Sequence, residues 1–320
     1  MDVPFWAWAA FVAFVALMIF LDLAVLHRHA KVIEFREAAW MSLGWVALAL
    51  IFGVIVWMTG GAESGGEYFA GYLIEKALSV DNIFVFALIF TYFAVPAEYQ
   101  HRVLVWGVIG ALIMRGIFIF LGAELLEAWD PIVYVFAAVL IITGIRMATH
   151  DNSEMDPSKN VILRAFRRMV PVTEKFHGAK FWVRKEEIDQ SEAVTDRRPL
   201  FGVWIATPLL ATVVMIESAD LVFAIDSIPA IFAITTDTFI VFTSNAFALL
   251  GLRALYFMLS GAMERFVYLQ VGLSVVLVFV GLKFIWGDLF GKVPIWVSLP
   301  FIAIVVGASI TASLLKTRER

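Results

Sequence analysis

The sequence contains no cysteine in its 320 residues. This absence excludes disulfide bonds, metal sites built on thiolates and redox chemistry of cysteine. Charged residues are also scarce, because Asp, Glu, Lys and Arg together make up 16% of the chain. Soluble domains hold about 25% of such residues. A single water-soluble domain of this length is therefore not expected.

Apolar residues take the place of the missing charges. They make up 62% of the chain, and the mean hydropathy is +0.88. Runs of about 20 apolar residues recur, which is typical of membrane-spanning helices. The first run lacks the basic start of a cleaved signal peptide, so we expect it to be retained. We predict one all-α polytopic integral membrane domain over residues 1–320. About nine helical spans are expected, at residues 5–26, 39–58, 67–94, 103–123, 129–148, 205–234, 239–260, 266–286 and 293–315.

Lys and Arg in the connecting loops predict the orientation, because cytoplasmic loops carry more of them. The loops after the first, third, fifth and seventh spans are basic, and so is the C-terminal tail. We therefore expect the N-terminus outside and the C-terminus in the cytoplasm. The exception is the end of the eighth span with the loop that follows, which carry Lys283 and Lys292 on the predicted outer side.

The polar segment 149–199 is the one sizeable hydrophilic piece, and we expect it to be a cytoplasmic loop. Its stretch "SKNVILRAFRRMV" has apolar residues at helical spacing and a basic face. This stretch either lies on the inner membrane surface or is a plain basic connector. "KFWVRKEE" has the pattern of a short strand.

Two segments of the chain resemble each other. "EKALSVDNIFVFALIF" at 75–90 aligns with "DLVFAIDSIPAIFAIT" at 220–235, and sequences around Arg115 and Arg253 also match. Spans three to five thus pair with spans six to eight. A unit of three spans must run through the membrane in opposite directions in its two copies. The sequence therefore predicts a 3+3 inverted-topology repeat, which in transporters places the substrate site where the repeats meet.

The predicted spans contain acidic residues, although a carboxylate at the centre of a spanning helix costs about 2.5–3.5 kcal/mol. Lys76, Arg115 and Arg253 are available inside spans as partners in a purely structural ion-pair network. The alternative is an ion or proton pathway, which intramembrane acids usually mark. The acids are Glu75, Asp81, Glu217, Asp220 and Asp226.

Helix geometry and topology suggest how these acids are placed. Glu75 and Asp81 are six residues apart and do not share a face of one helix. The repeat pairs Asp81 with Asp226 near the membrane centre, with Glu75 above and Asp220 below as separate stations. Pro229 predicts a break in the sixth span, which would free carbonyl oxygens for a cation.

The donor set predicts a hard cation. Carboxylates, Asn82, Ser227 and carbonyls supply oxygen ligands, which suit Mn²⁺, Ca²⁺ and Mg²⁺ alike. Asn245 is a further candidate oxygen donor, and Asp22 a candidate at the end of the first span. Zinc and copper are disfavoured because cysteine is absent and all five histidines fall in predicted loops. They are His27, His29, His101, His150 and His177.

The motifs "EKALSVDNIFVF", "IESADLVFAIDSIPAIFAIT" and "FTSNAFALLGLRALY" resemble the TerC family, and "FRRMVPVTEKFHGAKFWVR" resembles its Alx-like branch. The resemblance covers most of the chain. It implies a bacterial inner-membrane protein related to the LysE transporter superfamily, with a family name derived from tellurium resistance. It also implies export of manganese. The implied ion site consists of Glu75, Asp81, Asn82, Glu217, Asp220, Asp226 and Ser227.

We therefore expect a secondary transporter that exports Mn²⁺ by alternating access, coupled to protons. Its partners are the divalent substrate ion and the lipid bilayer, with no resident cofactor and no nucleic acid. Two alternatives stay open: another cation such as Ca²⁺, and a non-transporting scaffold in membrane-protein assembly or tellurite stress. An enzyme is not expected, because no nucleophile–base pair or cofactor motif is present. The oligomeric state is open.

Overall fold

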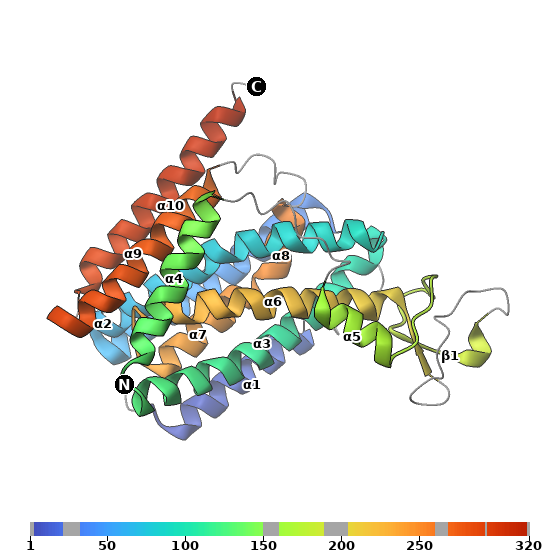
Figure 1. The fold of residues 1–320 in the computed structure, drawn as a ribbon, viewed down its shortest axis with the longest axis horizontal. Helices are drawn as coiled ribbons and strands as arrows, with labels where there is room; N and C mark the ends of the chain where they lie inside the picture. The colour runs from blue at the N-terminus through green and yellow to red at the C-terminus, as the bar shows by residue number, and fades with distance from the viewer. Residues whose placement is uncertain are drawn as a thin grey trace.

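The computed structural model describes residues 3–21, 33–149, 160–188, 204–259, 268–291 and 293–318. Within these ranges the chain is a bundle of α-helices with a very small sheet at one end (Figure 1). The helices are α1 (Phe5–Leu21), α2 (Phe35–Tyr92), α3 (Ala97–Ala128), α4 (Ile132–Thr149), α5 (Val161–Met169), α6 (Pro208–Phe232), α7 (Thr238–Leu250), α8 (Leu252–Leu259), α9 (Leu269–Phe290) and α10 (Ile295–Arg318). The strands are β1 (Trp182–Arg184) and β2 (Trp204–Ala206).

Seven helical stretches in the described part of the chain are long and apolar enough to cross a membrane. They are α2, α3, α4, α6, α7 with α8, α9 and α10, while α1 is apolar but shorter. Large apolar side chains point outward: Phe5, Met58 and Trp296 are 87%, 81% and 73% exposed. Such a surface fits lipid rather than water. The chain is thus an all-α polytopic membrane protein, and the count of nine spans stays a prediction.

The long helix α2 contains a turn at Gly61, where φ is +85° and ψ is 177°. Its two arms, residues 35–60 and 62–92, fold back on each other. The Tyr68 hydroxyl donates to the carbonyl of Ala49 at 3.1 Å, and Trp57 and Phe69 have ring centroids 6.5 Å apart. The bounds of the second and third predicted spans left residues 59–66 as a loop, which is wrong, because Gly61 with positive φ makes the turn and the flanking residues stay helical.

The sixth predicted span is not broken. Helix α6 runs from Pro208 to Phe232, and Pro229 lies inside its last turn. Proline lacks the N–H that would bond the carbonyl of Ile225, but so close to a helix end this loss does not interrupt the helix. The seventh span is interrupted instead, at Gly251 between α7 and α8.

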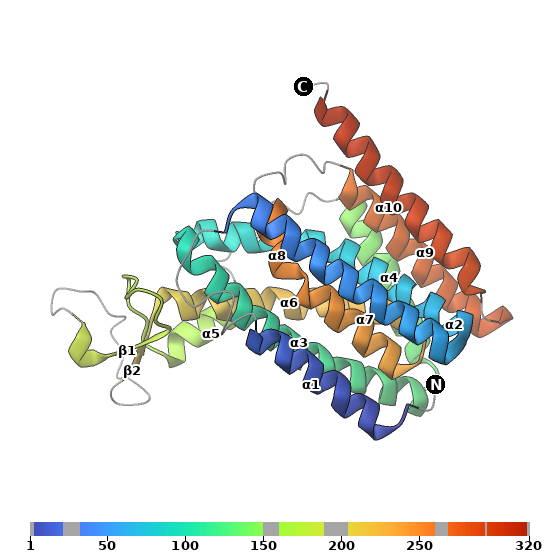
Figure 2. The same cartoon turned by 180° about the vertical axis from the view of Figure 1, so that it is seen from behind.

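The part of segment 149–199 that the structure describes confirms two local predictions. "SKNVILRAFRRMV" contains α5, and "KFWVRKEE" contains β1. Strand β1 pairs with β2 in antiparallel fashion, with Val183 opposite Ile205. Nearby, Lys180 bonds Glu187 and lowers the pKa of that exposed carboxyl below its ordinary value. Both views place α5 and the strands at one end of the bundle, away from α10 (Figures 1 and 2).

The packing of the helices places the second arm of α2 and α6 in the middle of the bundle. The most extensive contacts are made by α4 with α9, by α2 with α7 and α8, and by α3 with α6. Helix α1 lies along the outside of α3 (Figure 2), with the rings of Trp8 and Phe120 5.4 Å apart. The apolar core joins α2, α3, α6 and α8 and includes Ile83, Leu104, Leu209 and Tyr256.

Candidate functional site

The guanidinium of Arg115 on α3 connects three helices in the interior. Its Nε and Nη2 donate to the two carboxylate oxygens of Asp220 on α6, at 3.0 and 2.9 Å. Its Nη1 donates to Glu75 on the second arm of α2 and to the hydroxyl of Ser227, the latter at 3.0 Å. We call Glu75, Arg115, Asp220 and Ser227 the central cluster.

The central cluster is closed off from solvent and carries more negative than positive charge. Glu75, Arg115, Asp220 and Ser227 are each at most 2% exposed. Two carboxylates face one guanidinium, so the cluster has an excess of one negative charge when all three groups are ionised. Glu75 Oε2 has no hydrogen-bond partner among the described residues. Buried carboxylates that are not fully paired attract a further cation or proton.

The structure corrects the predicted order of the acids. Glu75 and Asp220 were expected as separate stations on opposite sides of the centre, but both contact the same guanidinium. The reason is that Arg115 reaches between α2 and α6 and draws the two carboxylates together. Spacing along single helices carries no information on such a bridge.

Glu217 lies outside the central cluster, about one helical turn from Asp220 on α6. Its carboxylate rests against Gly110 of α3, where any side chain would collide with it, and Gly107 lies close by. Neither carboxylate oxygen has a hydrogen-bond partner among the described residues. The glycines of α3 therefore make the space that the buried carboxylate of this half-buried residue occupies.

Asp226 also lies apart from Arg115. Its Oδ1 accepts a hydrogen bond from the Thr143 hydroxyl of α4 at 2.8 Å. Thr143 was not predicted as a site residue, because a single threonine in an apolar helix is common. Asn82 is buried on α2 at 2% exposure. The Asp81 side chain falls outside the described part of the structure, so its predicted meeting with Asp226 stays a prediction.

The other intramembrane cations have different surroundings from Arg115. Arg253 contacts the ring of His101, with 3.0 Å between Nη1 and Nε2. His101 was predicted in a loop, which is wrong, because α3 begins at Ala97 and buries this ring. The ammonium of Lys76 is buried with no hydrogen-bond partner among the described residues, next to Gly251. The Nδ2 of Asn245 is also buried without a hydrogen-bond partner in the part of the chain that the structure describes, whereas Asp22 lies outside that part.

No three His, Asp or Glu side chains in the described ranges are placed so that they could hold a metal ion together. The central cluster supplies two carboxylates and one hydroxyl. These are oxygen donors of the kind that hard cations take. In the arrangement seen here, the guanidinium of Arg115 provides the positive charge between them.

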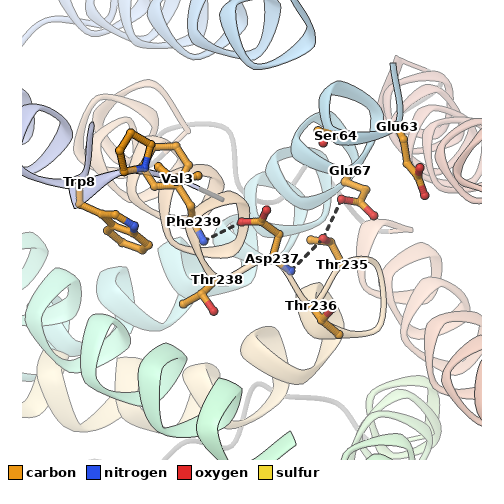
Figure 3. A pocket seen from close by; sticks show the side chains of 11 residues that line it. Val3, Trp8, Glu63, Ser64, Glu67, Thr235, Thr236, Asp237, Thr238 and Phe239 are labelled. Carbon is orange, nitrogen blue, oxygen red and sulfur yellow. Dashed lines mark hydrogen bonds between the residues drawn. The ribbon is translucent and has the colours of Figure 1, made fainter. Parts of the chain in front are cut away.

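A polar cavity of about 750 Å³ opens at the end of the bundle where α2 turns and α6 joins α7 (Figure 3). Glu63, Glu67 and Asp237 line it, together with the start of α1. The Thr235 hydroxyl donates to Glu67 at 2.7 Å, and Asp237 caps α7 by accepting from the N–H of Phe239 at 3.0 Å. The sequence does not predict this cavity, because its residues come from α1, α2 and the connection between α6 and α7, which are far apart in the chain.

Comparison with known proteins agrees with this architecture. The chain is 50% identical to "Uncharacterized membrane protein STKORF319" of Myxococcus xanthus over 98% of this chain and 93% of that one. It is 42% identical to Alx of Escherichia coli (strain K12), whose name describes it as a candidate membrane-bound redox modulator, over 91% and 89% of the two chains. No solved structure matches. Residues 60–320 match the family described as "Integral membrane protein TerC family". The chain therefore belongs to the TerC family of integral membrane proteins.

Proposed function

We propose that this protein is a secondary transporter that exports divalent metal cations, foremost Mn²⁺, from the cytoplasm across the bacterial inner membrane. Alternating access carries the ion past the central cluster, and inward proton movement drives it. The observation that carries the proposal is the closed group of two carboxylates, a hydroxyl and one arginine inside an otherwise apolar bundle. Intramembrane charges of this kind are expensive and mark ion pathways.

The arrangement of the helices supports the inverted repeat on which alternating access depends. In the inverted repeat, α2 corresponds to α6, and α3 corresponds to α7 together with α8. The contact between α3 and α6 therefore corresponds to the contact of α7 and α8 with α2. Both contacts are among the most extensive in the bundle. Helices α4 and α9 exchange places and also pack on each other. Such symmetry permits two equivalent states that open to opposite sides.

The ion would follow α6 from one side of the membrane to the other. With the cytoplasm on the side of segment 149–199, the order along α6 is Glu217, Asp220 and then Ser227. The polar cavity lined by Glu63, Glu67 and Asp237, called the acidic cavity below, then lies at the outer end of the bundle. We infer that Glu217 receives the ion, that the central cluster binds it and that the acidic cavity releases it.

Arg115 gives the site a way to reset. Its guanidinium neutralises Glu75 and Asp220 in the arrangement seen here. A divalent cation placed between the same carboxylates would repel the guanidinium, so we infer that Arg115 turns away as the ion binds. Its return would expel the ion and close the pathway.

Export against an inside-negative potential requires coupling, because moving two positive charges outward costs about 4.6 kcal/mol per 100 mV. Inward protons are the simplest driving ions, and the carboxylates that bind the metal can also carry them. A redox role through thiols is excluded for this chain, since it has no cysteine.

Flux through purified protein tests the proposal. Proteoliposomes containing the wild-type chain should accumulate Mn²⁺ in response to a proton gradient, and Glu75→Gln or Asp220→Asn should abolish this flux. Glu127→Gln is the matched control, because Glu127 is an exposed acid at the end of α3. Wild-type flux in both site variants would refute the site.

The same preparation separates the other candidate functions. Faster flux of Ca²⁺ than of Mn²⁺ would change the substrate but keep the transport mechanism. A scaffold in membrane-protein assembly or tellurite stress predicts no flux of any metal at any pH, and tolerance of the acid-to-amide changes in cells. If cells expressing Asp81→Asn and cells expressing Asp226→Asn both still export Mn²⁺, neither acid belongs to the ion site.

A further inference from the structure

Helix α5 is attached at its start to α6, and the chain beyond its end is attached to β2, just before α6 begins. Asn160 precedes its first turn and donates from Nδ2 to the Ser218 hydroxyl at 2.9 Å, while its Oδ1 accepts from the N–H of Leu163. Beyond the other end of α5, the N–H of Thr173 donates to the carbonyl of Ala206 at 2.9 Å. Helix α5 therefore runs antiparallel to α6 along its first turns (Figure 1).

This attachment sets how far α5 reaches along the spanning helix. Ser218 lies ten residues after the start of α6 at Pro208, which is about 15 Å along the helix axis. The start of α5 thus lies beside a membrane-crossing segment. It does not hang below the bundle.

Three kinds of side chain occupy three different sides of α5. Leu163 is buried and Phe166 half-buried, so their side faces α6. At 100° per residue, Ile162 and Met169 lie about 20° apart on a second side, and Val161 lies at the edge of that side next to Arg168. Val161, Ile162 and Met169 are 75%, 42% and 56% exposed. The arginines share the third side and are exposed: Arg164, Arg167 and Arg168.

The exposed apolar side of α5 continues onto α6. Val222 and Ile225 follow Ser218 by four and seven residues, so they lie on the same side of α6 as the attachment point. They are 53% and 54% exposed. The guanidinium of Arg167 lies 5.7 Å from the ring centroid of Phe93, where α2 ends. Arg167 thus lies beside the end of α2.

We propose that α5 lies against α6 at the membrane boundary, where Val161 and Ile162 contact the acyl chains of the adjacent leaflet and Arg164 and Arg167 bind anionic lipid headgroups. The apolar side fits the acyl chains and the arginine side fits the phosphates, as in other amphipathic helices at membrane surfaces. The inference goes beyond ion transport and does not depend on which ion is carried.

The absence of cysteine makes a direct test possible. A single cysteine is introduced by Ile162→Cys and labelled with an environment-sensitive fluorophore. The protein is placed in nanodiscs of phosphatidylcholine alone or mixed with phosphatidylglycerol. Phosphatidylglycerol should shift the emission to shorter wavelength and protect the label from iodide. Glu186→Cys, an exposed position after β1, should stay accessible to iodide in both lipids.

A second variant tests the arginines. Adding Arg164→Gln and Arg167→Gln to the Ile162→Cys chain should weaken the protection by phosphatidylglycerol, by about fivefold in the docking equilibrium per arginine. A label at 162 as accessible to iodide as the label at 186 would overturn the proposal. Equal protection in neutral and anionic nanodiscs would overturn the binding of anionic headgroups. Size-exclusion profiles matching wild type would verify that each variant is folded.

Discussion

Arg115 and Asp220 form a two-point ion pair across the interface of α3 and α6, with both guanidinium–carboxylate contacts near 3 Å. The planar fork of an arginine matches a carboxylate in this way, and a lysine ammonium does not. The same guanidinium also binds Glu75 and Ser227, so one side chain sets the positions of three helices.

Replacing Arg115 should therefore destabilise the bundle strongly. Arg115→Met leaves Glu75 and Asp220 buried without their partner, and breaking a buried ion pair in this way costs about 3–5 kcal/mol. Arg115→Lys keeps the positive charge but lacks the planar fork, so its loss of stability should be intermediate. Thermal unfolding of the purified protein in detergent measures both changes.

Lys185→Met is the control for the loss of a cation, because Lys185 is exposed outside the helical bundle. Its unfolding midpoint should match that of the wild type. The bridging role would be wrong if Arg115→Met unfolded at the wild-type temperature too.

Gly110→Ala should also destabilise the protein, because the added Cβ would collide with the carboxylate of Glu217. The cost should shrink when Glu217 is shortened, so Gly110→Ala combined with Glu217→Ala should lose less stability than the sum of the two single changes. Residues in contact typically couple by about 0.5–3 kcal/mol in such cycles. Unfolding of the four proteins in detergent gives the coupling.

Gly44→Ala is the matched helical glycine, since a Cβ there meets nothing within 4 Å. It should be neutral or stabilising by up to about 1 kcal/mol, as expected for alanine in a helix. If Gly44→Ala and Gly110→Ala reduced the free energy of unfolding equally, close packing against Glu217 would not be the cause of the destabilisation.

The attachment of α5 can be separated into its two hydrogen bonds. Asn160→Asp keeps an oxygen that caps the N–H of Leu163 but loses the donor to Ser218, whereas Asn160→Ala loses both. A lost N-cap costs about 1 kcal/mol. Hydrogen exchange at residues 161–169 should therefore be fastest in Asn160→Ala and intermediate in Asn160→Asp.

Ser218→Ala completes this set, because it removes the partner of Asn160 without touching the cap. Its exchange should match that of Asn160→Asp. If residues 161–169 were protected from hydrogen exchange as in the wild type in all three variants, α5 would be held by its apolar contacts alone.

The sequence predicted the helical segments and the presence of charged residues inside them, because both can be read from local hydropathy. Glu75, Asp220 and Arg115 were each identified in this way. The contact that these three residues share was not predicted, because it depends on the orientation of three helices about their axes. The spacing of residues along the chain does not predict the two-point ion pair between Arg115 and Asp220.

Two local predictions failed for a related reason. Pro229 was predicted to break the sixth span, and residues 59–66 were predicted to be a loop between the second and third spans. The structure keeps α6 intact at Pro229 and turns α2 at Gly61 alone, where φ is positive. The position of a proline within a helix and the φ of one glycine decide these outcomes, and tertiary packing sets both.

Lys76 should behave opposite to Arg115, although both are cations in the interior. Its Nζ is buried and has no hydrogen-bond partner among the described residues. A buried charge without a partner opposes folding. Lys76→Met keeps most of the volume and removes the charge, so the unfolding temperature should be equal to or higher than that of the wild type.

Gly251 provides a second measurement at the same place. A Cβ on Gly251 would lie 2.6 Å from the Lys76 Nζ, so Gly251→Ala should displace the ammonium and lower the unfolding temperature. If the ammonium itself is the obstacle, Lys76→Ala should reduce that loss. A large loss of stability in Lys76→Met would instead mean that the ammonium is needed for folding, and Lys76 would then join Arg115 as a structural cation.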